Sequence, residues 1–512
     1  MKFELLHLTP VSASFELQNS SIYFSEEPYD VILNGKTVLF AVKTNVFSLF
    51  DLEDDTDYEI KVGEDSLSFH TPKAAAILRL SSFLKPMNGG DDDTLRIQTA
   101  IMTTPRGGVL ILDEEEMHAT SLFLKSHMTL VIPKGCTLFG NTDKGAYPFI
   151  PGEVEVKDAL PYEINTFEGD PKVGMPSLLS AYFAKDLNVV GEGTIDAQAQ
   201  KSEFWIDVKK LKWARPHVVF LNHCENVGFC GVTVKNSPCW TIHPFFSDHL
   251  GFYDLKISNP KDAPNTDGLN PQSCEDVKII GVYFSVGDDC IALKSGKYYI
   301  GKTFKRPTKD VVIRNCYMHE GHGAVVLGSE VGAGLDNLLI ERCYFEHTDR
   351  GLRIKSRRGR GQDSRMTGIH FKNIIMDNVL TPITANMFYF CDPDGHDAWV
   401  QDRKPRKVDE TTPYLGTFVF ENMTCTNAEW ALGYFYGLPE MPIESITFKN
   451  CSFTMKDDCS KGQPIMAEGV ERIAKEGFHF LNVKNIRFEN VKAEGYKGER
   501  VNQENVGAFV ET

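Results

Sequence analysis

The sequence predicts an all-β protein in which a small N-terminal β-sandwich precedes a long parallel β-helix. Three observations support this fold class: alternating strand-like runs in about the first 72 residues, a loose strand repeat from about residue 187, and Asn and Gly residues near the corners of that repeat. Hydrophobic residues make up 42% of the 512 residues and charged residues 24%, as in ordinary globular proteins. A chain of this length can form one large core and a smaller domain, which we place at residues 76–512 and 1–75.

Residues 1–75 are expected to form the separate β-sandwich. The runs SASFELQ and YDVILNG alternate in polarity, and Asn34-Gly35 is a turn signal between strand-like segments. The segment LEDDTDYEIKV (52–62) resembles the tyrosine-corner strand of fibronectin type III domains, with Leu52, Thr56 and Tyr58 at the matching places. Because a corner tyrosine is a structural feature, we see no chemistry in this domain and expect it to serve binding or spacing.

Residues 88–106 predict a helix at the start of the second domain. Asp92 or Asp93 can cap this helix. Its apolar face would consist of Leu95, Ile97, Ala100 and Ile101. Strand-like segments take over from VLILDE onward, so we expect the helix to cover the first coil of the β-helix.

A loose repeat of strand-forming segments dominates the chain from about residue 187. The segments follow each other at about 25 to 35 residues, which indicates a stacked array, and their apolar period of two indicates strands. A single coil cannot bury its inward face, whereas stacked coils form a continuous core. A β-propeller is the alternative, but its blades need four strands each and a more regular spacing. The segments are ENVGFCGVTV (225–234), EDVKIIGVYF (275–284), KDVVIRNCYM (309–318), DNLLIERCYF (336–345), TGIHFKNIIM (367–376), GTFVFENMTC (416–425), ESITFKNCSF (444–453) and KNIRFENVKA (484–493).

Two long irregular segments interrupt the repeat, at about residues 143–178 and 390–414. Long loops in a compact repeat fold are often functional. We therefore expect these two segments to form walls of a substrate cleft.

The net charge of −16 argues against nonspecific binding of nucleic acid or of an anionic membrane. No stretch is long and apolar enough to span a bilayer. The same charge would repel an acidic substrate, which would therefore need a local basic patch. Such a patch is present in RIKSRRGR (353–360), with five cations in eight residues.

The twelve cysteines show no CxxC spacing, and Cys316, Cys343 and Cys451 fall in hydrophobic strand patterns. Buried reduced thiols are therefore expected, rather than disulfides or metal sites, and we predict no cofactor. The first ten residues carry Glu4 and lack a sustained apolar run, so we expect no signal peptide and a cytoplasmic location.

Four short motifs fall on successive coils of the predicted repeat. They are Asn265-Thr266-Asp267, Gly287-Asp288-Asp289, Gly321-His322-Gly323 and Arg353-Ile354-Lys355. Taken singly, each could be a turn or an alternating strand. Equivalent positions on neighbouring coils lie roughly 4.8 Å apart, so the four together would place three carboxylates, an imidazole and two cations on one outer face.

This set of motifs resembles glycoside hydrolase family 28, the polygalacturonases. The segments SPCWTIHP (237–244), ISNPKDAPNTDGLNP (257–271), SVGDDCIALKSG (285–296), VVLGSE (325–330) and TDRGLRIKSRRGRG (348–361) resemble its bacterial exo-acting branch. The likeness covers most of residues 85–500. It implies a right-handed parallel β-helix and an inverting hydrolase that releases α-1,4-linked galacturonate from the end of pectin-derived oligogalacturonides.

The resemblance also implies roles for the acidic cluster. It assigns Asp288 as the general acid, with Asp267 and Asp289 activating the water. Inverting enzymes keep their two carboxyls about 6.5–9.5 Å apart to admit that water. Crowded like charges would keep one carboxyl protonated, and His322 would hydrogen-bond into the cluster and tune its proton.

Arg353 and Lys355 match the family's binders of the substrate carboxylate, where Arg can form two parallel hydrogen bonds and Lys acts as a point charge. Further candidates for contacts with sugars are Asn265, Lys294, Arg357, Arg358 and Arg360. For the outer cations a solvated loop is the alternative. Trp213 and Arg215 would form a stacking and charge contact, with a core tryptophan as the alternative.

Three other functions stay open at this point. The first is a hydrolase of the same fold that acts on rhamnogalacturonan or another decorated pectin. The second is a pectate lyase, which usually requires Ca²⁺, although no Ca²⁺ loop is evident. The third is a β-helix that binds glycans without cleaving them. We favour the exo-acting hydrolase because a cytoplasmic enzyme would meet imported oligogalacturonides; the sequence predicts no oligomeric state.

Overall fold

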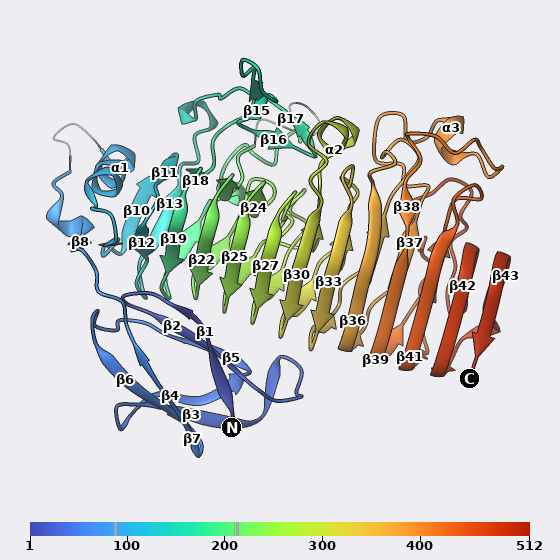
Figure 1. Cartoon of the computed structure of the whole chain (residues 1–512), viewed down its shortest axis with the longest axis horizontal. Helices are drawn as coiled ribbons and strands as arrows, with labels where there is room; N and C mark the ends of the chain where they lie inside the picture. Colours follow the sequence, from blue (N-terminus) through green and yellow to red (C-terminus); the bar gives the residue numbers. More distant parts are fainter. Residues whose placement is uncertain (86–89, 209, 211–214) are drawn as a thin grey trace.

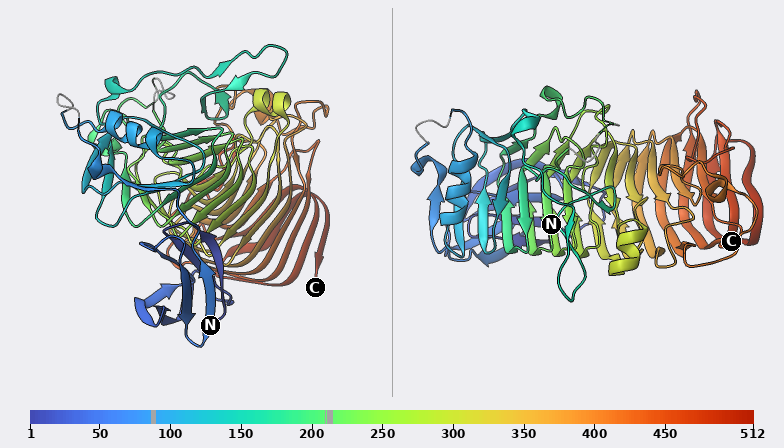
Figure 2. Two further views of the ribbon diagram at one scale, coloured as in Figure 1. Left: turned by 60° about the vertical axis from the view of Figure 1, so that its left-hand side comes forward. Right: turned by 90° about the horizontal axis from the view of Figure 1, so that it is seen from above.

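A computed structural model describes residues 1–85, 90–208, 210 and 215–512, and its main body is the predicted right-handed parallel β-helix (Figure 1). The coils of the β-helix stack along the long axis of the molecule. The N-terminal strands lie beside the first coils, on the opposite side from the long loops (Figures 1 and 2). No helix in the described residues is both long and apolar enough to cross a membrane.

The first seven strands form two antiparallel sheets with a shared core around Phe15, Val31 and Ile60. One sheet contains β1 (Phe3–Leu8), β2 (Ala13–Leu17) and β5 (Val46–Leu49). The other contains β4 (Lys36–Thr44), β3 (Phe24–Leu33), β6 (Asp57–Val62) and β7 (Asp65–His70). The Tyr58 hydroxyl accepts a hydrogen bond from the Glu53 N–H at 2.8 Å, as a corner tyrosine would. The resemblance of this region to fibronectin type III domains, and its boundary after residue 75, stay predictions.

Helix α1 (Thr94–Thr103) lies at the start of the β-helix, after β8 (Ile77–Arg79). Its side chains in the main core are Ile97, Ala100 and Ile101. The prediction was wrong for Leu95, which is exposed. Arg96 is buried in its place, because its guanidinium donates to Glu114 Oε2 at 2.8 Å and so keeps a partner for its charge.

Three columns of parallel strands run along the β-helix. The first column contains β9 (Gly108–Ile111), β12 (Met128–Val131), β19 (Lys185–Val190), β22 (Glu225–Cys230), β25 (Asp248–Tyr253), β27 (Glu275–Ile280), β30 (Thr308–Arg314), β33 (Leu335–Glu341), β36 (Arg365–Asp377), β39 (Thr417–Ala428), β41 (Ile443–Met455) and part of β42 (Glu476–Glu494). The second begins with β10 (Glu116–Ala119), β13 (Thr137–Gly140), β20 (Thr194–Asp196), β23 (Thr233–Lys235), β26 (Lys256–Ser258), β28 (Tyr283–Ser285), β31 (Tyr317–Glu320) and β34 (Tyr344–Glu346), and then uses the second halves of β36, β39 and β41.

The third column carries the predicted motifs. It contains β11 (Leu122–Leu124), β18 (Leu179–Tyr182), β21 (Val219–Asn222), β24 (Ile242–Phe245), β29 (Asp289–Leu293), β32 (Gly323–Leu327), β35 (Arg350–Lys355), β37 (Thr381–Asn386) and β40 (Ala431–Tyr436), followed by the start of β42 and by β43 (Lys497–Glu511). Leu269 bridges Ile242 and Ile291, so the column is continuous between β24 and β29.

The core runs the whole length of the β-helix, because one inward position of the first column is apolar on every coil. This position is occupied by Leu130, Val189, Phe229, Phe252, Ile279, Ile313, Ile340, Phe371, Phe420, Phe448 and Phe488, all fully buried. The predicted corner residues include asparagines with positive φ, such as Asn315 and Asn373. An L residue adopts this left-handed conformation most easily when it is Asn or Asp.

All twelve cysteines are free, and most are buried, as predicted. Cys316, Cys343 and Cys451 each place Sγ near a carbonyl oxygen of the preceding coil, for Cys316 that of Ile279 at 3.4 Å. Within the described residues, no group of three or more His, Cys, Asp or Glu side chains is arranged to hold a metal ion.

The two long irregular segments rise on the same side of the β-helix, together with α2 (Tyr298–Phe304) (Figure 1). The first carries the short strands β14 (Glu153–Val154), β15 (Tyr162–Glu163), β16 (Thr166–Phe167) and β17 (Asp170–Pro171). The second carries α3 (Ala398–Gln401) and ends at β38 (Tyr414–Leu415).

Candidate active site

The four motifs lie at the entrance to the third column, on coils that stack directly. Gly268 N–H donates to the Asp289 carbonyl at 2.9 Å, and Asp289 pairs with Gly323 on the next coil. Val326 then pairs with Arg353. The parallel register therefore brings four segments that are far apart in the sequence to one place.

These side chains line one cavity of about 300 Å³. The predicted site residues that line it are Asn265, Asp267, Asp288, Asp289, Lys294, His322, Arg353 and Lys355. Both long segments contribute to its walls, as expected, the first with Glu168 and the second with Cys391 and Asp392. A third loop, between β41 and β42, adds Met466.

Asp289 is the carboxylate that is paired with the two predicted binding cations. Lys355 Nζ lies 2.7 Å from Asp289 Oδ2, and Arg353 Nη1 lies 3.3 Å from Oδ1. All three side chains are buried or nearly so. Burial alone would raise the pKa of Asp289, but the charges of Lys355 and Arg353 outweigh it and hold the pKa well below the usual value. These two cations therefore favour the ionised form of Asp289.

Gly323 leaves the gap through which these cations reach Asp289 from two coils away. A Cβ atom on Gly323 would lie 3.3 Å from Asp289 Oδ1, 3.4 Å from Arg353 Cβ and 2.5 Å from Val326 Cγ2. Any larger residue would therefore crowd the ion pair. This explains why the Gly-His-Gly motif ends in glycine.

Asp288 faces the other way, toward His322 and solvent. Nδ1 of His322 lies 3.2 Å from Asp288 Oδ1, and the His322 backbone N–H donates to the Asp288 carbonyl at 2.8 Å. The hydrogen bond to Asp288 raises the pKa of His322, although partial burial opposes it. The imidazolium form is thus favoured beside this carboxylate.

Asp267 belongs to a second buried ion cluster. Asn270 Nδ2 donates to Asp267 Oδ2 at 2.9 Å, and Lys294 Nζ lies 3.8 Å from the same oxygen. Burial, together with the charge of Asp288, raises the pKa of Asp267 well above the usual value. Burial and the neighbouring Asp288 carboxyl therefore both favour the protonated form of Asp267.

Of the two further residues that the sequence singled out, Arg215 has a supporting position. Arg215 is buried, and its Nη2 donates to Asn265 Oδ1 at 2.8 Å, which fixes the Asn265 side chain at the cavity wall. Trp213, predicted to accompany Arg215, lies outside the described residues.

The family of the chain can now be stated. The model of glycosyl hydrolases family 28 matches residues 128–398, more than half of the chain. The protein belongs to glycosyl hydrolases family 28.

Relatives and solved structures agree with this. A probable polygalacturonase from Vitis vinifera is 28% identical over 346 residues, which are 67% of this chain and 66% of the relative. An endo-polygalacturonase from Pectobacterium carotovorum subsp. carotovorum is 31% identical over 281 residues, 52% of this chain and 64% of that one. The chain thus spans slightly less than two thirds of both relatives.

Among solved structures, a family 28 exopolygalacturonase from Yersinia enterocolitica superposes with a TM-score of 0.72 at 17% identity, covering 99% of this chain and 98% of that one. An exopolygalacturonase from Thermotoga maritima gives 0.66 at 23% identity, covering 81% and 91%. At these identities the likeness shows that the fold is shared.

The structure corrects one predicted site residue of this family 28 protein. Arg358 does not line the cavity, because its guanidinium is held by Glu440, with Nε to Oε1 at 2.6 Å, and by the Val400 carbonyl at 3.0 Å. Arg357 is paired with Asp394 and Arg360 with Asp392. These outer arginines are buried and paired with acidic side chains rather than solvated, and they fix the second long loop to the β-helix.

The residues of the cavity wall that were missed as individual candidates include Trp240, Glu330 and Tyr389. Trp240 and Glu330 lie in the segments SPCWTIHP and VVLGSE, so the signal was present, but neither residue carries chemistry that a motif reading would single out. Tyr389 follows the end of β37 and has no sequence signal of its own. Its ring lies 5.9 Å from the Arg353 guanidinium and 5.5 Å from Lys355 Nζ, so it is a wall for both cations.

Proposed function

We propose that this family 28 enzyme hydrolyses the α-1,4 linkage of galacturonate chains with inversion, and that it releases sugar from one chain end. One observation carries the proposal: a single cavity in which Asp267, Asp288 and Asp289 lie with the buried cations Arg353 and Lys355. Carboxyl groups supply the acid and the base that glycoside hydrolysis needs. Buried cations select a sugar that carries its own carboxylate.

In the proposed reaction Asp288 gives its proton to the leaving glycosidic oxygen as the bond to the anomeric carbon breaks. A water molecule forms the new bond from the opposite face and loses its proton to Asp267 or Asp289. The three carboxyls titrate as a coupled group. A proton on Asp267 therefore has to reach Asp288 only once the sugar is bound. His322 lies within hydrogen-bonding distance of Asp288 and can return a proton to it afterwards.

The incoming sugar carboxylate would change the charge of the site. The charge of Asp289 is neutralised by Lys355, whose Nζ lies 2.7 Å from Oδ2, and by Arg353, whose Nη1 lies 3.3 Å from Oδ1. A substrate carboxylate would compete for both cations. The negative charge of Asp289 would then be less fully neutralised, and Asp289 would become a better base for water. Binding of a uronate, and not of a neutral sugar, would therefore prepare the site for reaction.

Exo action is supported by the way in which the cavity is closed. Lys297 connects the two long loops, because its Nζ lies 3.1 Å from Asp392 of the second loop and 3.6 Å from Asp170 of the first. Its backbone N–H also donates to the Gly169 carbonyl at 2.9 Å. A groove closed in this way on one side would accept a chain end, whereas an open groove would accept the middle of a chain.

A time course of the products from tri- to hexagalacturonate tests the proposal. The expected result is release of one small product from the start, with inverted configuration, in the presence of a chelator and with no rise in ultraviolet absorbance. A mixture of intermediate lengths would contradict exo action, and an unsaturated, Ca²⁺-dependent product would indicate a lyase. Cleavage of rhamnogalacturonan oligomers alone would change the substrate, and binding without turnover would remove the enzyme assignment.

A further inference from the structure

A buried lysine in the cavity is shared unequally between two carboxylates. Lys294 Nζ lies 2.8 Å from Glu330 Oε2 but 3.8 Å from Asp267 Oδ2. Its ammonium also lies over the face of the Trp240 ring, 4.3 Å from the ring centre. The three charged side chains are at most 10% exposed, so their attractions are only weakly screened.

Glu330 is fixed by its surroundings rather than by Lys294 alone. Its carbonyl accepts the Ser295 N–H at 2.7 Å, and its Cβ and Cγ pack so closely on Gly169 of the first long loop that a Cβ there would lie 2.8 Å from each. The position of the Lys294 ammonium is therefore set by Glu330, and not the reverse. Burial opposes ionisation of Glu330, but Lys294 and Lys297 outweigh it and lower the pKa, so that the partner of Lys294 is a carboxylate.

We propose that Glu330 is a positioning residue of the hydrolase: it holds the Lys294 ammonium away from Asp267, and so prevents a close ion pair that would weaken Asp267 as an acceptor of the water proton. This role rests on the proposed function. It deepens that function because it makes the first long loop, which packs on Glu330, part of the proton chemistry.

Replacement of Glu330 by Gln tests this role. Gln keeps the shape that packs on Gly169, while Lys294 is left with Asp267 as its nearest carboxylate. The charged form of Asp267 is then favoured, its pKa falls, and it stays ionised at lower pH. We expect the acidic limb of kcat/KM to move to lower pH by about one unit, with kcat reduced on the plateau.

Two further variants separate this role from a merely structural one. Glu410→Gln removes a carboxylate that pairs with Lys302 at 3.7 Å outside the cavity, and it should leave the profile unchanged. In a Lys294→Met background, Glu330→Gln should move the limb by less than half as much, because the effect passes through Lys294. An equal displacement in both backgrounds would overturn the proposal.

A readout without turnover distinguishes this proposal from the proposed function. The carboxyl carbon of Asp267 is followed by ¹³C NMR as a function of pH, with Asp267→Asn to assign it. If the titration moves in Glu330→Gln but no galacturonate is cleaved by the wild type, the positioning stands and the substrate is wrong. If the wild type cleaves galacturonate and neither the titration nor the limb moves, the positioning role fails.

A second inference, independent of catalysis, concerns the N-terminal domain (β1–β7). The last outward position of the first strand column is apolar on six successive coils, at Ile111, Val131, Val190, Cys230, Tyr253 and Ile280. Val11 and Val46 of the N-terminal domain pack on this row. An outward row of this kind would be in water if the domain were free to leave it.

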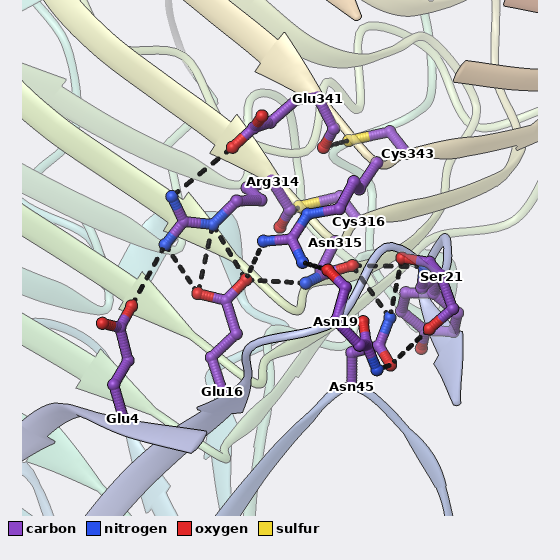
Figure 3. Close-up of polar contacts among 12 residues, drawn as sticks. Glu4, Glu16, Asn19, Ser21, Asn45, Arg314, Asn315, Cys316, Glu341 and Cys343 are labelled. Atoms are coloured by element: carbon purple, nitrogen blue, oxygen red, sulfur yellow. Dashed lines mark hydrogen bonds and ion pairs between the residues drawn. The ribbon is translucent and has the colours of Figure 1, made fainter. Parts of the chain in front are cut away.

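The row becomes ionic at the next coil, where Arg314 follows Ile280. There the carboxylate of Glu16 of β2, which is fully buried, accepts hydrogen bonds from Arg314 Nη2 at 2.6 Å and from Asn315 Nδ2 at 2.6 Å (Figure 3). It also accepts a hydrogen bond from Arg342 Nη2 at 3.0 Å. Figure 3 also shows Asn45 beside Asn315, with Nδ2 to Oδ1 at 3.1 Å. A buried carboxylate with all its partners on another domain requires that the two stay together.

We infer that the N-terminal domain is a fixed staple across these coils, which stabilises the part of the β-helix that carries the cavity. It therefore has no freedom to swing as a sugar-binding module. Glu16→Ala should leave Arg314 and Arg342 with an unfilled gap and lower the Tm by at least about 3 °C. Glu4→Gln is the matched control, because Glu4 lies 3.8 Å from Arg314 but is half exposed, and its Tm should change by less than about 1 °C.

Calorimetry and a distance measurement decide between a staple and a mobile module. The wild type should unfold in one transition, and a fluorophore pair that joins the N-terminal domain to the β-helix should report one narrow distance distribution. In Glu16→Ala that distribution should broaden. A broad distribution in the wild type, or equal Tm values for Glu16→Ala and Glu4→Gln, would overturn the inference.

Discussion

At the residue scale, the cavity divides its three carboxyls by environment. Asp289 is neutralised by cations, Asp267 is enclosed with a raised pKa, and Asp288 is paired with an imidazole at the open side. Chemically identical groups thus differ in their readiness to give or take a proton. The sequence predicted the triad, but not that the pKa of Asp267 would be raised, because this depends on burial and on the position of Lys294 nearer to Glu330.

Replacement of Asp288 by Asn is expected to lower kcat by roughly 10³-fold or more, since the proposed proton donor to the leaving oxygen is lost. The same change removes the main reason for the raised pKa of His322, which should fall toward or below its ordinary value. NMR titration of the His322 ring checks this, with His249, paired with Asp276 far from the cavity, as an internal control. Near-wild-type turnover would contradict the acid role, and an unchanged His322 titration would contradict the pairing.

Replacement of Arg353 by Ala is expected to raise KM for oligogalacturonates by about tenfold or more, because one of the two cations facing the sugar carboxylate is lost. Arg353→Lys should lie between this variant and the wild type, since it keeps the charge but not the two parallel hydrogen bonds. Arg487→Ala, which removes a surface arginine paired with Glu489, serves as the control for loss of one positive charge. Unchanged steady-state kinetics in Arg353→Ala would remove this residue from the substrate site.

At the element scale, the repeat predicted the strands and their order on the coils well. An apolar period of two and Asn at corners are local signals, and stacking follows from them. The pairing of the outer arginines was not predictable, because Arg357 and Arg358 find their acids, Asp394 and Glu440, in loops whose course no local pattern sets. Leu95 was misplaced for a similar reason: Glu114 lies on the next segment and draws Arg96 inward.

Replacement of Gly323 by Ala tests how closely the third column fits the ion pair. The new methyl group would press on Val326 and narrow the gap between Asp289 and Arg353. We expect a loss of stability of about 1–3 kcal/mol and a fall in kcat/KM of about tenfold or more. Denaturant unfolding and kinetics measure the two effects, and full activity in a stable variant would show that the gap is wider than the structure indicates.

Replacement of Lys297 by Met should loosen the contact between the two long loops. The cavity would then open at the side that Asp170 and Asp392 close, so products from internal cleavage should appear beside those from the chain end. Lys302→Met is the matched control, because Lys302 lies in α2, which begins directly after Lys297, and pairs with Glu410 outside the cavity. Chromatography of early products from hexagalacturonate decides; an unchanged product pattern would assign the closure to other contacts.

At the scale of the whole molecule, stability depends on a few buried charges as well as on the long core. Glu163 of β15 is 1% exposed, and burial raises its pKa from the ordinary value of 4.5 to about 8. Its folded form therefore holds a proton that the unfolded chain releases above about pH 4.5. This stabilising contribution is complete below pH 4.5 and is lost as the pH rises toward 8, at about 1.4 kcal/mol per unit.

Glu163→Gln should remove this dependence. The variant is expected to be as stable as the wild type near pH 4.5 and more stable by a few kcal/mol near pH 8, because Gln carries no charge to bury. Thermal or denaturant unfolding across that range measures the difference. Parallel stability curves for the two proteins would contradict the buried, protonated state of Glu163.

The outward row of the first strand column has a consequence for how the coils find their places. After Ile280 the row continues through Arg314, Glu341, Lys372, Glu421, Lys449 and Glu489, so that the sign of the charge alternates from one coil to the next. A nascent chain that skipped one coil would set Arg314 against Lys372, or Glu341 against Glu421, and like charges directly opposite repel. A stack that skipped one coil would therefore be less stable than the observed one, whereas the apolar row before Arg314 makes no such distinction.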